Sequence, residues 1–107
     1  MARAVDNKTF AKIKNTVLGK EYDLSVAYVS PREMRRAGKG KHTSNVLAFP
    51  LSQHSGEILL CPVAAKPFSV EYLFIHALLH LKGLKHGATM EREEDRLLKR
   101  YHFRRNA

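Results

Sequence analysis

Three histidines with a regular spacing are the residues of this 107-residue chain best suited to chemistry. His76 and His80 are four residues apart in an apolar stretch, so on a helix they lie one turn apart on the same face. Gly83 follows, and glycine often ends a helix in a left-handed conformation, after which the chain can fold back and bring His86 beside the first two. Three imidazole nitrogens with a fourth position open are typical of a catalytic zinc site. The pattern His-x-x-x-His-x-x-Gly-x-x-His therefore predicts one bound Zn²⁺ per chain.

The alternative is that these histidines are ordinary core residues. One histidine on an apolar helix usually is, but three at this spacing beside a glycine are harder to explain without a metal. The other histidines lack such spacing and are predicted to lie in loops or on the surface: His42, His54 and His102.

No general base can be assigned. His54 and Glu57 are candidates because they precede or lie on a strand that could border the site.

The histidines belong to a stretch, Ser69–His86, that should form a central helix. Only four residues between Val70 and Leu81 carry a polar group: Glu71, Tyr72, His76 and His80. A helix that is apolar on all sides is expected inside the protein. Ser69 is a suitable N-cap.

The remaining chain predicts a small sheet with further helices. The expected elements are a helix over 6–18 ending at Gly19, a strand over 22–29, a short helix begun by Ser30-Pro31, a flexible basic loop over 37–41, a strand over 46–49 stopped by Pro50, a strand over 56–61 stopped by Pro62, and a last helix capped by Thr89. In that last helix Met90, Leu97, Leu98 and Tyr101 share one stripe. We therefore expect an α+β fold, with a small mixed β-sheet, helices packed on it and the central histidine-bearing helix, all in one domain over 1–107.

Composition points to a polyanionic partner. Lysine and arginine total 19 against 10 acidic residues, a net charge of +9. Acids early and bases late in the last expected helix complement its dipole and explain part of this excess. The other basic cluster is formed by Arg32, Arg35, Arg36, Lys39 and Lys41; it is either a solvated face, which is the default for such a run, or a nucleic-acid-binding surface. The single cysteine, Cys61, suits the cytoplasm, and no apolar run of membrane-spanning length or signal peptide is present, so no membrane partner is expected.

The ordered motifs resemble those of the YbeY family of endoribonucleases, which act in ribosomal RNA maturation. The family motif His-Gly-x-Leu-His-Leu-x-Gly-x-Asp-His corresponds to residues 76–86. Its Thr-Asp/Asn-Val-Leu-Ser-Phe-Pro stretch corresponds to Ser44–Pro50, and its Gly-Asp-Ile/Leu strand to Gly56-Glu57-Ile58. The resemblance covers roughly residues 22–101. It implies a mixed α+β fold, a three-histidine zinc site, a single-stranded RNA substrate such as ribosomal RNA and possible contact with the small ribosomal subunit.

Three departures from the family pattern bear on the site. Ala77 replaces a glycine, Lys85 replaces an aspartate, and the segment between Pro62 and Pro67 is shorter than the family's, which usually holds another helix. A lysine pointing towards the metal would oppose its binding, so Lys85→Asp is expected to tighten zinc binding. The family's functional arginine corresponds to Arg36 or Arg35.

The sequence thus predicts a zinc-dependent endoribonuclease. His76, His80 and His86 would hold a metal that activates water or polarises a phosphoryl oxygen. Arg36, with Arg35 as its substitute, would neutralise phosphate charge in the transition state, and a further set of basic residues would hold backbone phosphates: Arg32, Lys39 and Lys41. A zinc protease would need a glutamate where Ala77 stands. The stronger alternative is a non-catalytic RNA- or ribosome-binding module with a structural metal site.

Overall fold

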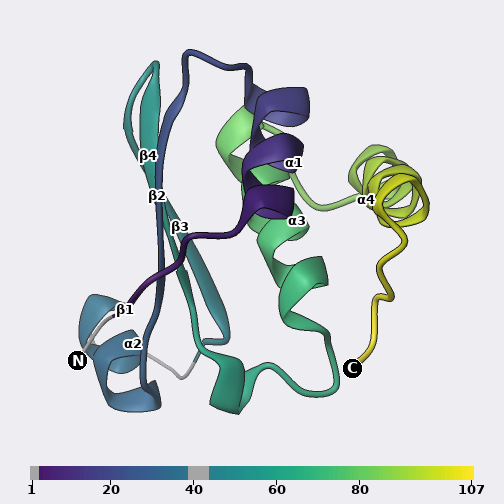
Figure 1. The fold of residues 1–107 in the computed structure, drawn as a ribbon. Coiled ribbons are helices and arrows are strands. Elements are labelled where there is room, and N and C mark those ends of the chain that lie inside the picture. The colour runs from purple at the N-terminus through teal and green to yellow at the C-terminus, as the bar shows by residue number, and fades with distance from the viewer. Residues whose placement is uncertain (1–2, 39–43) are drawn as a thin grey trace.

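The computed structural model describes residues 3–38 and 44–107. Its elements are β1 (Arg3–Ala4), α1 (Lys8–Leu18), β2 (Asp23–Tyr28), α2 (Pro31–Ala37), β3 (Val46–Ser52), β4 (Ser55–Leu60), the 3₁₀ turn η1 (Pro62–Ala64), α3 (Val70–Lys82) and α4 (Ala88–Tyr101). Helices α1 and α3 cover one face of a sheet, and α4 packs against α3 on the side away from the sheet (Figure 1). Within the described residues, no helix is both long and apolar enough to cross a bilayer.

The sheet has four strands in the order β1-β2-β4-β3. β2 and β4 are parallel, whereas β1 pairs with β2 and β3 pairs with β4 in antiparallel fashion. The expected α+β fold with a mixed sheet is therefore confirmed. β3 is an edge strand, which leaves one side of it open beside the helix layer.

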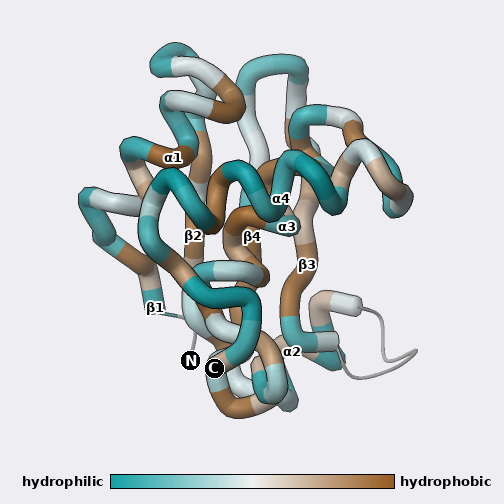
Figure 2. The backbone as a smooth tube through the Cα atoms, turned by 90° about the vertical axis from the view of Figure 1, so that its right-hand side faces the viewer, coloured by the Kyte–Doolittle hydropathy of each residue, from teal (hydrophilic) through white to brown (hydrophobic). Residues whose placement is uncertain are grey.

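Helix α3 forms the centre of the main core, as the sequence predicts. Ser69 caps it by accepting a hydrogen bond from the Tyr72 amide. Phe74, Ile75 and Leu78 are fully buried, and the Phe74 ring stacks on Phe10 of α1 at 4.0 Å between centroids. In Figure 2 the outer helix α4 is largely hydrophilic, and hydrophobic stretches lie on the strands behind it. Burial of this apolar surface is the main stabilising contribution to the fold.

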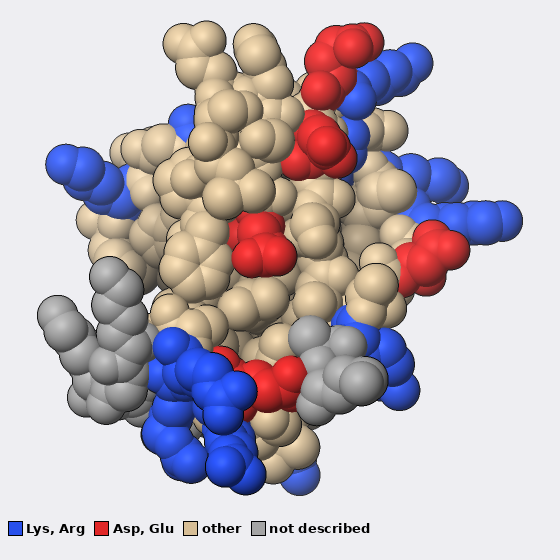
Figure 3. Space-filling view, turned by 90° about the vertical axis from the view of Figure 1, so that its left-hand side faces the viewer, with Lys and Arg blue, Asp and Glu red and all other residues tan. Residues whose placement is uncertain are grey.

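Helix α2 lies on the opposite face of the sheet. It begins with the predicted capping box, in which Ser30 and Glu33 bond each other's backbone amides. Its buried Met34 forms a second, smaller cluster with Val29 and Cys61, against which Leu47 packs. Figure 3 looks at this face of the molecule, and basic side chains gather at its lower end, where α2 lies in Figure 1.

Two boundary predictions need correction, and one strand is not among the expected elements. β3 does not stop at Pro50 but runs to Ser52, because an edge strand tolerates a proline, and the register shifts between Pro50 and Ser52. Thr89 does not cap α4, which starts at Ala88 after Gly87; the Thr89 hydroxyl instead accepts a hydrogen bond from Arg92. β1 was not predicted, since two exposed residues carry no strand pattern. Of the expected basic loop over 37–41, residues 39–41 lie outside the described residues.

Candidate metal centre

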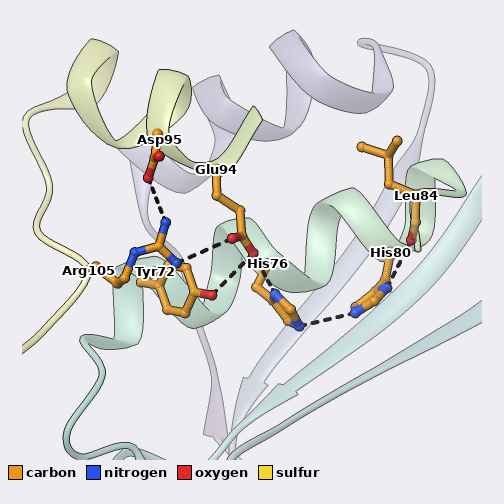
Figure 4. A network of polar contacts seen from close by, with 7 residues as sticks. All are labelled: Tyr72, His76, His80, Leu84, Glu94, Asp95 and Arg105. Carbon is orange, nitrogen blue, oxygen red and sulfur yellow. Dashed lines mark hydrogen bonds and ion pairs between the residues drawn. The ribbon is translucent and has the colours of Figure 1, made fainter. Parts of the chain in front are cut away.

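The three histidines of the motif converge at one point. One ring nitrogen from each of His76, His80 and His86 lies within 4.8 Å of the others. His76 and His80 point from the same side of α3 towards each other (Figure 4). Their ring centroids are 4.5 Å apart, and the His86 ring lies 5.1 Å from His76 and 4.7 Å from His80. The predicted convergence is therefore found in the fold.

The turn at the end of α3 both delivers His86 and orients His80. Gly83 adopts a left-handed conformation with φ of 110°, which a residue with a side chain rarely takes. Its amide bonds the His80 carbonyl, and the Leu84 amide bonds the Leu79 carbonyl, so the turn closes tightly. The Leu84 carbonyl then accepts a hydrogen bond of 3.0 Å from Nδ1 of His80. Because a carbonyl can only accept, this contact fixes the proton of a neutral His80 ring on Nδ1.

His76 is oriented in the same way by a carboxylate on α4. Its Nδ1 lies 2.6 Å from Oε2 of Glu94, which is 2% exposed. The Tyr72 hydroxyl donates to the same oxygen at 3.2 Å, and Arg105 donates to Oε1 at 3.3 Å. Burial, and then the charge of Glu94, raises the pKa of Tyr72, so its hydroxyl remains a donor. A carboxylate held by these donors accepts the His76 Nδ1 proton.

These contacts leave two lone pairs that face each other. With both Nδ1 atoms protonated, Nε2 of His76 and Nε2 of His80 are acceptors, yet they lie 3.1 Å apart (Figure 4). A proton between the two nitrogens also removes the repulsion, and His76, beside the Glu94 carboxylate, is the ring better placed to carry it, because burial above all lowers the pKa of His80. A cation that accepts both lone pairs fits this arrangement. Neutral imidazole nitrogens with oriented Nδ1 protons are typical zinc ligands.

The histidines open into a groove of about 520 Å³ between α3 and the edge strand β3. Its walls consist of the three histidines, Ala77 and a run of β3 and the residues before it, Ser44, Asn45, Val46, Leu47 and Ala48. His86 is exposed and has no hydrogen-bond partner among the described residues, so it is the least restrained of the three. Ala77 is buried and lines the groove where a metzincin peptidase would carry its glutamate. The described lining contains no carboxylate.

Other residues singled out in the sequence lie away from the groove. Arg32, Arg35 and Arg36 are exposed on α2, which packs on the opposite face of the sheet, and none of them lines the groove. His54 is exposed in the β3–β4 turn, and Glu57 lies on β4 between the buried Gly56 and Ile58. The remaining basic and histidine candidates, Lys39, Lys41 and His42, lie outside the described residues.

Glu94, which holds His76, was missed in the sequence because it belongs to a run of acids that suits the start of any helix. A signal was present: Glu94 is four residues after Met90 and three before Leu97, so it lies on the buried stripe of α4. An acid on an apolar stripe needs partners. Lys85, by contrast, is exposed and lines none of the pockets described around the histidines.

Comparison with known proteins agrees with the motifs and the geometry. Endoribonuclease YbeY of Rubrobacter xylanophilus is 35% identical to this chain over 80 residues, an alignment that covers 67% of the chain. The chain spans 58% of the length of that relative. No protein-family model and no solved structure matched. The relative, the three motifs in their order and the convergent histidines identify this chain as a divergent member of the YbeY family.

Proposed function

We propose that this protein is a metal-dependent endoribonuclease that cuts single-stranded RNA, with ribosomal RNA as the substrate and the cytoplasm as the setting, and that residues 1–107 act as one domain. The observation that carries the proposal is the convergence of three histidines, with one ring nitrogen of each within 4.8 Å of the others and the Nε2 atoms of His76 and His80 3.1 Å apart. The printed name of the relative, an endoribonuclease, supports the class of reaction.

His76, His80 and His86 would hold one Zn²⁺, which would supply Lewis acidity at the scissile phosphate. Glu94 and the Leu84 carbonyl hold the Nδ1 protons of His76 and His80 and thereby aim Nε2 of each ring into the groove. The open wall of β3 gives an extended single strand a place to lie beside the histidines. A duplex is a poorer fit to a groove of this size than one strand, whose bases are free to turn.

The basic residues would bind RNA phosphates. Arg36, with Arg35 as its substitute, is the proposed cation for a phosphate near the cleaved one, and a further set would hold the backbone: Arg32, Lys39 and Lys41. Because α2 lies on the sheet face opposite the histidines, we propose that its arginines contact phosphates that flank the cleaved one. The RNA strand would then pass from the histidine groove around the β3 edge of the sheet to α2. Such contacts strengthen binding without reading sequence.

A second candidate is a non-catalytic RNA- or ribosome-binding module with a structural metal site, and the small ribosomal subunit would be its partner. The observation in its favour is the absence of a carboxylate from the described lining of the groove, with Ala77 at the position of a metzincin base. In this case the protein would bind zinc and RNA but would not cut the strand.

Cleavage of a labelled single-stranded RNA separates the two candidates. We expect chelator-treated wild type to be inactive and added zinc to restore its cleavage. The His80→Ala variant should be inactive with and without added zinc. His102→Asn is the matched control, because His102 is exposed, lies outside the groove and has a left-handed conformation that asparagine tolerates. Zinc and RNA binding without cleavage by the wild type would favour the binding module. Equal cleavage by the wild type and His80→Ala would assign the activity to a contaminant.

A further inference from the structure

The segment that follows α4 returns along the start of α3. The Ser69 amide donates to the Arg105 carbonyl at 2.9 Å, and the Ser69 hydroxyl donates to the Arg104 carbonyl at 2.5 Å. Phe68 and Asn106 pair as an isolated antiparallel β-bridge, and the Ala107 amide donates a hydrogen bond to the Pro67 carbonyl. These backbone contacts fix the position of Arg105 beside the first turn of the histidine helix.

The Arg105 side chain extends from this segment towards the buried carboxylate of Glu94. One guanidinium nitrogen lies 3.3 Å from Oε1 of Glu94, and another lies 2.6 Å from Asp95. The guanidinium carbon lies 4.5 Å from the centre of the Tyr72 ring. Burial favours the neutral form of Arg105, but its bond to Asp95 and its contacts with Tyr72 and Glu94 outweigh this, and the pKa of Arg105 is raised. The carboxylate is therefore compensated from the side away from the histidines (Figure 4).

A buried carboxylate is costly unless it is paired. Each oxygen of Glu94 has a partner: Arg105 at Oε1, and Tyr72 and His76 at Oε2. The shortest of these contacts, 2.6 Å, is the one to His76. Two of these contacts form a chain from Arg105 through Glu94 to His76, and the Tyr72 hydroxyl joins it at Glu94.

We propose that Glu94 and Arg105 are positioning residues: Glu94 holds the His76 ring with its proton on Nδ1, Arg105 holds Glu94, and the segment after α4 thereby sets the affinity of the three histidines for Zn²⁺. This inference rests on the proposed metal centre. It is independent of whether RNA is cut. Removal of such an outer partner of a ligating histidine typically weakens metal binding by about 10- to 100-fold.

Two measurements test the proposal, and the first needs no metal. Nitrogen-15 NMR of the metal-free protein reports which ring nitrogen of His76 carries the proton. We expect Nδ1 to carry it in the wild type, and a mixture of both tautomers in Glu94→Gln, because an amide can also turn its NH₂ group towards the ring. A wild-type His76 protonated mainly on Nε2 would overturn the proposal.

The second measurement is zinc affinity by competition with a coloured chelator. We expect Glu94→Gln to bind zinc about 10- to 100-fold more weakly and Arg105→Gln to lose less than that. The double variant should be no weaker than Glu94→Gln alone, since both changes act through one contact. Asp95→Asn is the matched control: it removes the charge of the nearer partner of Arg105 at an exposed position, keeps an oxygen that can accept the hydrogen bond, leaves Glu94 in place, and should keep wild-type affinity.

The outcomes separate this proposal from the proposed function. Glu94→Gln within twofold of the wild-type affinity would overturn the positioning role and leave the metal centre intact. A wild type that binds no zinc, but holds His76 in the expected tautomer, would overturn the metal centre instead. Thermal melts of the metal-free variants check folding. If Glu94→Gln does not fold, Tyr72→Phe takes its place, because it removes the Tyr72 donor to Glu94 and should weaken zinc binding measurably. Unchanged zinc affinity in Tyr72→Phe would count against the proposal.

Discussion

Nδ1 of His80 lies 3.0 Å from the carbonyl oxygen of Leu84, so the turn that ends α3 also orients one of its histidines. Gly83 makes this possible, because its left-handed conformation closes the turn between the two residues. The same turn brings His86 beside His76 and His80. One glycine thus places two of the three candidate ligands.

Gly83→Ala is expected to lower both stability and zinc affinity. A side chain at φ of 110° strains the backbone by roughly 1–3 kcal/mol, although nothing lies within 4 Å of the added methyl group. Relaxation of the turn would move the Leu84 carbonyl away from His80 and displace His86. Thermal denaturation and zinc titration measure the two effects.

Gly19→Ala is the control for this prediction. Gly19 also has a positive φ, 98°, and open space around it, but it ends α1 instead of the histidine helix. It should lose at least as much stability and keep wild-type zinc affinity. Equal zinc affinities for all three proteins would show that the turn does not hold the site.

RNA binding is expected to weaken steeply as salt is raised, because basic residues release counterions from the phosphates. Neutralising four residues of the basic cluster to glutamine should flatten the plot of log affinity against log salt by roughly 3, given a slope of about −0.7 per phosphate contact on a single strand. The four are Arg35, Arg36, Lys39 and Lys41.

A second quadruple variant, with the same change of charge, shows whether position matters. It neutralises exposed lysines elsewhere on the chain: Lys8, Lys12, Lys20 and Lys99. We expect a smaller change of slope in this control. If the two variants give the same slope, the cluster on and after α2 acts only through net charge.

Lys85→Asp should tighten zinc binding only slightly, by less than about fivefold. The residue is exposed and lines none of the pockets around the histidines, so water and salt screen its charge from the metal. The gain should disappear in molar salt, since screening acts on exposed charges. A tenfold or larger gain that persists in high salt would place the Lys85 ammonium inside the site.

Helix ends were predicted correctly from the sequence where the residue type strongly favours one position in a helix cap. Ser69 and Gly83 bound α3 as expected, and the capping box of α2 is present in full. The prediction was wrong at Pro50, because the sequence does not say which strand lies at a sheet edge. It was also wrong at Thr89, because α4 begins two residues earlier than a Thr89 cap would allow, at Ala88, with Gly87 in the N-cap position.

The site was predicted in part for a similar reason. Local spacing brings His76, His80 and His86 together through one helix and one turn, so it can be read from the sequence. Glu94 contacts His76 because α4 packs onto α3, and the two residues are 18 positions apart in the sequence. Arg105 is placed by the segment after α4, whose contact between Arg104 and Ser69 joins residues 35 positions apart. No local pattern encodes that arrangement. The same holds for α2, whose basic residues lie on the face opposite the histidines.

The most direct test of the metal centre is elemental analysis of the protein purified without added metal or chelator, beside His80→Ala prepared in the same way. We expect about one zinc ion per chain in the wild type, since three imidazole nitrogens lie within 4.8 Å of one another, a ligand set typical of zinc. His80→Ala should retain less than a tenth of that amount, in a protein that still melts cooperatively. A wild type without stoichiometric transition metal, or a variant that keeps as much zinc as the wild type, would contradict the account.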